Sequence, residues 1–83
     1  MEKRRSSREL LRAPGCIIVE GVEYPCEIHD RSVTGARLKD FRLTLPPEFM
    51  LRLIPQSSLA IRCWLIWQDG NEAGVSFIKP EQI

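Results

Sequence analysis

After residue 14 the chain alternates apolar and polar side chains with a period of two, and no segment sustains a helical period. A period of two places successive side chains on opposite faces of a β-strand. The clearest example is residues 22–29, whose alternate apolar side chains are Val22, Tyr24, Cys26 and Ile28. This pattern predicts a sheet with one buried face and excludes a helical bundle.

Turn signals divide the alternating region into six expected strands. Glu20-Gly21 and Asp69-Gly70 have the composition of tight turns between antiparallel strands, and Pro46-Pro47 falls in a longer connection. The expected strands are residues 15–20, 22–29, 36–39, 49–54, 59–67 and 73–78. Short strands with turn signals roughly every 8–12 residues predict an all-β fold, a six-stranded antiparallel barrel that is closed or nearly closed.

The alternation also predicts which way the tryptophans point. In residues 59–67, Cys63, Leu65 and Trp67 share one phase, which we expect to face the barrel interior. Trp64 has the opposite phase and is therefore the tryptophan that we expect to be exposed.

Charge is distributed unevenly between the two ends of the chain. With 83 residues the chain is long enough for one small domain, and its net charge of +1 argues against strong general affinity for nucleic acid. Residues 1–12 hold five basic and two acidic side chains, a net +3, whereas the remainder holds seven and nine, a net −2. We therefore expect a flexible basic arm over residues 1–12 and a barrel over residues 13–83. After the last expected strand there is room for one helical turn at most.

Catalytic and metal-binding residues are not evident. Cys16, Cys26 and Cys63 are odd in number, fit no metal-ligand spacing and lie among apolar residues. We expect them to be reduced, buried thiols of a cytoplasmic protein. The chain has neither an apolar run of about 18 residues nor a signal-peptide core, so we expect no membrane insertion. His29, the single histidine, has no evident nucleophile or metal partner and is expected to be a solvated surface residue.

Two polar motifs are the best candidates for a binding site, and the first lies in the basic arm. Arg4 and Arg8 are four residues apart, with Arg5 between them. Guanidinium groups bind phosphates and can contact the O6 and N7 edge of guanine with two hydrogen bonds. A solvated basic terminus explains the same residues without any ligand.

The second motif is Asp30-x-Ser32-x-x-Gly35, at the end of the second expected strand. Asp30 can accept hydrogen bonds from the N1 and N2 hydrogens of guanine, and Ser32 can donate to a phosphate or a base. Gly35 permits a positive φ or a close approach of another backbone. A plain Asx or Ser turn between two strands explains these residues equally well.

In combination, RxxxR and DxSxxG resemble the signature of PilZ domains, which are bacterial receptors for the second messenger cyclic di-GMP. Gly35–Leu38 and Gly74–Phe77 match further landmarks of the family, so the resemblance covers roughly residues 3–79. It implies a six-stranded antiparallel barrel, no enzymatic activity, no cofactor and no metal. Carried over by motif, the ligand-binding residues are Arg4, Arg5, Arg8, Asp30, Ser32 and Gly35, although the family pattern does not require Arg5.

The resemblance therefore implies a cyclic di-GMP receptor that changes its arm conformation and relays a signal to an unidentified partner protein, in motility or biofilm regulation. The family binds the nucleotide as an intercalated dimer or as a monomer. The residue before the first arginine of the motif bears on this choice, and here it is Lys3, a cation, which favours the dimer. One alternative is an adaptor of the same fold that does not bind the nucleotide. A second is a small barrel that binds single-stranded nucleic acid, which needs a basic groove and exposed aromatics; we expect neither DNA nor RNA as a partner. Many members of the family carry a helix after the barrel, and the few residues after the last expected strand allow one helical turn at most, which leaves the oligomeric state open.

Overall fold

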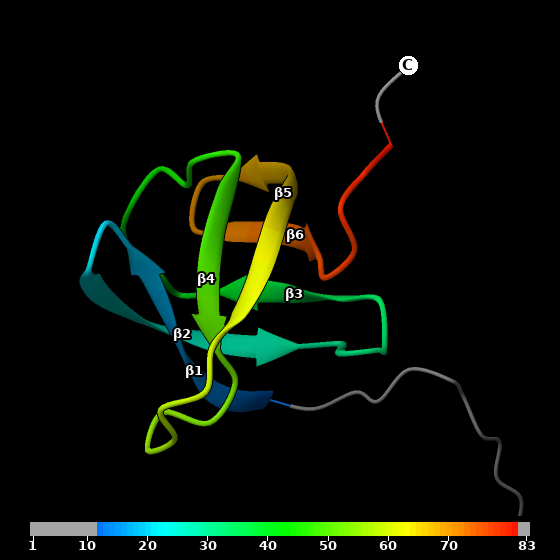
Figure 1. Ribbon diagram of the computed structural model, residues 1–83. Coiled ribbons are helices and arrows are strands. Elements are labelled where there is room, and N and C mark those ends of the chain that lie inside the picture. Colours follow the sequence, from blue (N-terminus) through cyan, green and yellow to red (C-terminus); the bar gives the residue numbers. More distant parts are fainter. Residues whose placement is uncertain (1–11, 82–83) are drawn as a thin grey trace, which may run out of the picture.

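Six antiparallel strands close into a barrel in the computed structural model, which describes residues 12–81 (Figure 1). Around the barrel the strands follow the order β1-β2-β3-β6-β5-β4, and β4 pairs with β1 to close it. The strands are β1 (Arg12–Val19), β2 (Val22–His29), β3 (Gly35–Lys39), β4 (Glu48–Arg52), β5 (Ile61–Asp69) and β6 (Glu72–Ser76). The prediction of a six-stranded all-β barrel is confirmed.

The first hairpin fixes where the chain enters the barrel. Glu20 and Gly21 have φ values of 52° and 81°, so both central residues of the β1–β2 turn are left-handed, as a tight two-residue hairpin requires. From this turn β1 and β2 pair without a shift until Arg12 lies opposite His29. The start of β1 therefore lies beside the end of β2.

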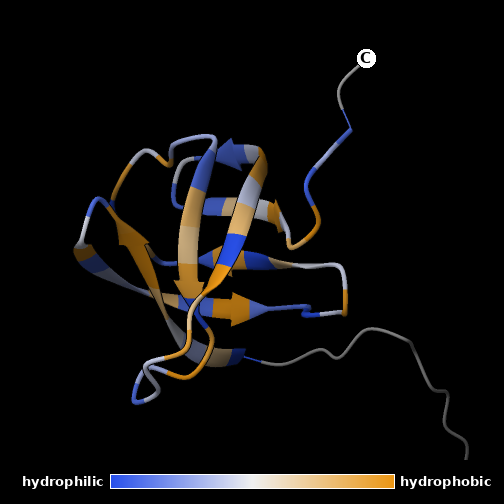
Figure 2. Ribbon diagram, in the orientation of Figure 1, coloured by the Kyte–Doolittle hydropathy of each residue, from blue (hydrophilic) through white to orange (hydrophobic). Residues whose placement is uncertain are grey.

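The inward-facing side chains fill the barrel, and the connection between β3 and β4 adds to the core. Figure 2 shows hydrophobic and hydrophilic residues alternating along the strands. Phe41 and Leu45 of the connection are almost fully buried. Gln68 holds this connection in place because its Oε1 accepts from the Leu45 N–H (2.9 Å) and its Nε2 donates to the Leu43 carbonyl (3.0 Å). The largest fully buried side chains are Phe41, Ile17, Ile28, Leu38, Leu51 and Cys63.

A β-bulge in β5 reverses the expected orientation of Trp67. Leu65 pairs with Val75 and Trp67 with Gly74, so Ile66 is an extra residue on the β5 side of the ladder. The prediction that Trp67 faces inward is wrong: the bulge turns its side chain outward, and 43% of its surface is exposed. Trp64, which we expected to be the exposed tryptophan, is only partly exposed.

Cys16, Cys26 and Cys63 are buried and are free thiols. Burial raises the pKa of Cys26 and of Cys63 to about 12, with a smaller contribution from a neighbouring cysteine in each case. Between residues 12 and 81, no three His, Cys, Asp or Glu side chains are grouped so that they could hold a metal ion. The same part of the chain has no helix long and apolar enough to cross a membrane.

Candidate functional site

The turn between β2 and β3 is an ordered structure held by its own polar groups. Asp30 begins it with a φ of 50°, a left-handed conformation that Asp tolerates better than most residues. The Ser32 N–H donates to the Gly35 carbonyl (2.8 Å), and Ser32 Oγ accepts from the Thr34 N–H (3.2 Å). The Phe77 N–H donates to the Thr34 carbonyl (2.8 Å), which ties the turn to the chain after β6.

Gly35 allows a close approach between two backbones. Its φ is not positive, but a Cβ atom at this position would overlap the carbonyl oxygen of Val75 on β6. Of the two roles expected for Gly35, the structure has the close approach. Ser32 uses its hydroxyl within the turn, as a plain Ser turn predicts, while its side chain also lines the hollow described below.

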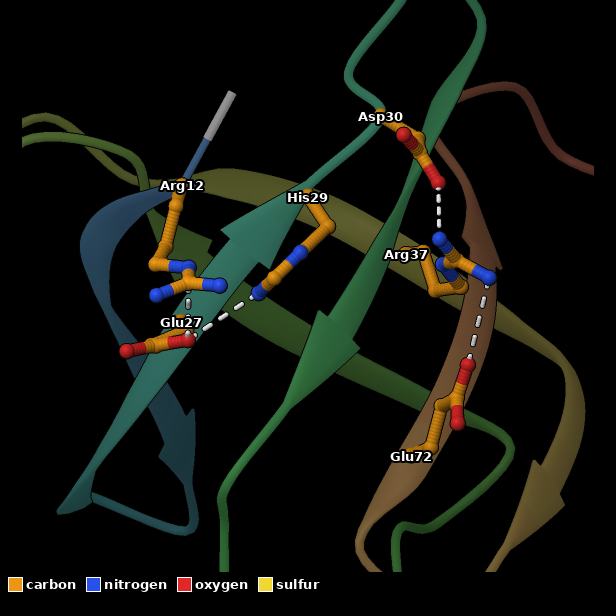
Figure 3. Close-up of polar contacts among 6 residues, drawn as sticks. All are labelled: Arg12, Glu27, His29, Asp30, Arg37 and Glu72. Carbon is orange, nitrogen blue, oxygen red and sulfur yellow. Dashed lines mark hydrogen bonds and ion pairs between the residues drawn. The ribbon is translucent and has the colours of Figure 1, made fainter. Parts of the chain in front are cut away.

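Three charged side chains form a row that runs from the β2–β3 turn across β3 to β6 (Figure 3). The Arg37 guanidinium pairs through Nη2 with the Asp30 carboxylate, and its Nη1 lies 3.4 Å from Glu72 Oε2. Asp30 is the most covered of the three, with 14% of its side chain exposed, against 40% for Arg37 and 32% for Glu72. Arg37 was not among the site residues predicted from the sequence, although it lies two residues after Gly35 on the same face of β3.

Trp67 adds an aromatic surface beside this row. Gly74 pairs with Arg37 on one side and with Trp67 on the other. A Cβ atom at position 74 would overlap the Trp67 indole, so the ring lies directly against the glycine backbone. Sequence alternation missed Trp67 because the β5 bulge changes the phase of the strand.

These groups surround a hollow of about 300 Å³, which we call the Asp30 hollow. Its lining residues are Asp30, Ser32, Gly35, Ala36, Arg37, Trp67 and Gly74. The structure therefore brings together three of the six site residues expected from the sequence. Arg4, Arg5 and Arg8 lie outside the described residues.

A larger hollow of about 430 Å³ lies over β1, β4 and β5, where Ile18, Met50 and Arg62 are among its lining residues. Its cation, Arg62, is paired with Glu48 (Nε to Oε2, 3.1 Å), just as Arg37 is paired in the Asp30 hollow, so pairing does not distinguish the two hollows. The Asp30 hollow is smaller, yet a carboxylate, a guanidinium, a hydroxyl and an indole converge on it. Ligand pockets use a small number of convergent polar groups to orient the ligand and give specificity, and the Asp30 hollow has such a set, so it is the better candidate.

A second charged cluster lies where β1 begins (Figure 3). His29 Nε2 is 3.0 Å from Glu27 Oε1, and Arg12 Nε is 3.9 Å from the same oxygen. The hydrogen bond from His29 lowers the pKa of Glu27, and the nearby Arg12 charge lowers it further. The expectation that His29 is solvated is wrong, since only 14% of its side chain is exposed. This cluster is adjacent to Asp30 in the chain.

Comparison with protein families identifies the chain. The model of the PilZ domain matches residues 2–83, and the chain therefore belongs to the PilZ family. The PilZ family comprises binding and adaptor domains and is associated with reception of cyclic di-GMP. A comparison with curated proteins found no match.

Proposed function

We propose that this protein binds cyclic di-GMP in the Asp30 hollow. The observation that carries the proposal is the convergence of Asp30, Arg37 and Trp67 on one outer face of the barrel. A guanine base presents donors at N1 and N2, acceptors at O6 and N7, and a flat face. The three side chains provide an acceptor, donors and an aromatic surface for these features.

Each side chain has a distinct role in this proposal. Asp30 is paired with Arg37, but an ionised carboxylate has lone pairs for further donors and can still accept from guanine. Arg37 donates to a guanine edge or to a phosphate oxygen. The Trp67 indole, supported from below by Gly74, stacks on a base.

Arg4 and Arg8 are the expected cationic partners of the phosphates and guanines, with Arg5 adding charge. The entry of the chain into the barrel supports this role, since Arg12 is opposite His29 and therefore close to Asp30. Four extended residues span about 14 Å at most, so Arg8 lies within that distance of Arg12, on the side of the barrel where β2 ends. We infer that residues 1–11 take a different position when the nucleotide is bound, and that the new surface is recognised by a partner protein.

Isothermal titration calorimetry of the purified protein tests the proposal. We expect cyclic di-GMP to bind, and GTP and a short single-stranded oligonucleotide to bind far more weakly. Asp30→Ala should weaken binding, whereas Asp69→Ala, which removes a carboxylate that does not line the Asp30 hollow, should leave it nearly unchanged. No heat and no shift in melting temperature with saturating cyclic di-GMP would refute the receptor and favour the adaptor. Tighter binding of the oligonucleotide would favour the nucleic-acid-binding alternative.

A further inference from the structure

Glu72 contacts the Asp30 hollow only through Arg37. Among the described residues that line the hollow, Arg37 is the one with a positive charge, and Glu72 is not part of the lining. Glu72 is the first residue of β6 and lies on the same outer face as Gly74, two residues further along the strand. Its carboxylate approaches Arg37 from the side away from Asp30 (Figure 3).

The two ion pairs occupy both terminal nitrogens of the guanidinium. Asp30 holds Nη2, and Glu72 Oε2 is 3.4 Å from Nη1. The Arg37 Nε–H is buried and has no acceptor among the described residues, so the polar contacts of the guanidinium there are these two ion pairs. Each Nη nitrogen carries two N–H groups, so a phosphate or base oxygen that approaches Arg37 must compete with the two carboxylates for the same guanidinium.

The Glu72 contact is the weaker of the two. It is longer, and the Glu72 side chain is 32% exposed against 14% for Asp30. Ion pairs in contact with water contribute little, because solvent screens the charges. The three groups also carry a net charge of −1, which disfavours an anion at this place. A nucleotide that displaces Glu72 gains the Nη1 donor, but must overcome both the ion pair and this charge.

We propose that Glu72 is a positioning residue that restrains Arg37 and thereby weakens binding of cyclic di-GMP. This inference rests on the proposed function of the Asp30 hollow. In the free protein Glu72 occupies the Nη1 edge of Arg37, and in the complex the nucleotide takes its place. The free energy needed to displace Glu72 must then come from other contacts with the nucleotide, including those of the arginines in residues 4–8.

The chain offers a matched control for this role. Asp69 lies directly opposite Glu72 on β5 and faces the same outer side. It carries the same charge, but among the described carboxylates Asp30 and Glu72 are the ones paired with Arg37. If negative charge alone weakens nucleotide binding, removing the charge of Asp69 or of Glu72 should have a similar effect. If the contact with Arg37 is responsible, only the change at Glu72 should strengthen binding.

The test compares cyclic di-GMP titrations of the wild type, Glu72→Gln and Asp69→Asn, each with a melting curve to verify folding. We expect Glu72→Gln to lower Kd by about two- to fivefold, the range of an exposed ion pair, and Asp69→Asn to change it by less. In an Arg37→Ala background the effect of Glu72→Gln should disappear. In the nucleotide-free proteins, the Arg37 Nε–H resonance should shift in Glu72→Gln and stay in place in Asp69→Asn.

The outcomes separate this inference from the function on which it rests. A wild type that does not bind cyclic di-GMP refutes both. A wild type that binds, with a Glu72→Gln variant that binds equally well or more weakly, refutes the restraint and leaves the receptor standing. An equal gain in Asp69→Asn, or a gain that persists without Arg37, assigns the effect to bulk charge and also refutes it.

Discussion

The indole of Trp67 lies directly against Gly74 on the neighbouring strand, in space that any side chain at position 74 would fill. Two local features produce this contact. The β5 bulge turns Trp67 outward, and Gly74 on β6 has no side chain to occupy the space where the ring lies. Because Arg37 is the partner of Gly74 on the other side, the ring and the guanidinium become neighbours.

Gly74→Ala should move Trp67 while leaving the barrel stable, because the atoms that a Cβ would meet belong to a side chain that can turn away. Gly35→Ala is the matched comparison, since there the Cβ meets the backbone carbonyl of Val75, which the β3–β6 ladder holds. We expect Gly35→Ala to cost about 1–3 kcal/mol of the free energy of unfolding and Gly74→Ala less. Thermal melts measure both, and equal losses would contradict this distinction.

Trp67→Ala should weaken binding of cyclic di-GMP by about 1–3 kcal/mol, the usual contribution of one base stacked on an aromatic side chain. Trp64→Phe is the control, because Trp64 lies outside the lining of the Asp30 hollow. In the Trp64→Phe protein the remaining indole fluorescence comes from Trp67 and should change on titration with the nucleotide. Unaltered fluorescence at saturation would exclude Trp67 from the binding site.

Arg4→Ala and Arg8→Ala should weaken nucleotide binding without altering the melting temperature of the free protein. Each lost contact between arginine and phosphate corresponds to about 1.5–3 kcal/mol. The affinity of the wild type should also fall as salt concentration rises, since these contacts are electrostatic. Normal affinity in both variants, or a melting temperature several degrees lower without ligand, would show that these arginines do not have the proposed role.

The strand pattern could be predicted from the sequence because it depends on local alternation and turn composition. The range 22–29 matches β2, and Gly21 and Gly70 have the positive φ values that their turns require. The DxSxxG motif drew attention to Asp30, Ser32 and Gly35, which line one hollow in the structure, and their role in ligand binding stays a prediction. The outward orientation of Trp67 could not be predicted, because it depends on a bulge. The bulge arises from the pairing of β5 with β6 and is not visible in the alternation of β5 alone.

Arg37 and Glu72 were missed for a related reason. Each is an ordinary charged residue on the outer face of its own strand. Their contact depends on the β3–β6 register, which places Arg37 opposite Gly74 and Glu72 opposite Lys39. The exposure of His29 was overestimated for the same reason, because its side chain is shielded from solvent by Glu27 and by residues of the neighbouring strands β1 and β3.

The Glu27–His29 contact predicts a dependence of stability on pH. The folded-state pKa of Glu27 is lowered, chiefly by the hydrogen bond from His29, so the contact stabilises the fold above the unfolded-state pKa of about 4.3. This contribution is lost as pH falls through the lower folded-state pKa. Glu27→Gln should therefore be less stable than the wild type at pH 7, with a smaller difference at pH 3. Denaturant unfolding at both values measures this, with the exposed Glu20→Gln as control; a gap that widens in acid would contradict it.

Backbone and indole NMR shifts during a titration with cyclic di-GMP test the location of the binding site most directly. The Asp30 hollow predicts the largest changes at residues 30–37, at the Trp67 indole N–H and at Gly74, with the amides of residues 4–8 also affected. Signals of Ile18 and Met50, which line the larger hollow over β1 and β4, should remain in place. Shifts that concentrate at Ile18 and Met50 and spare Trp67 would contradict the proposed site.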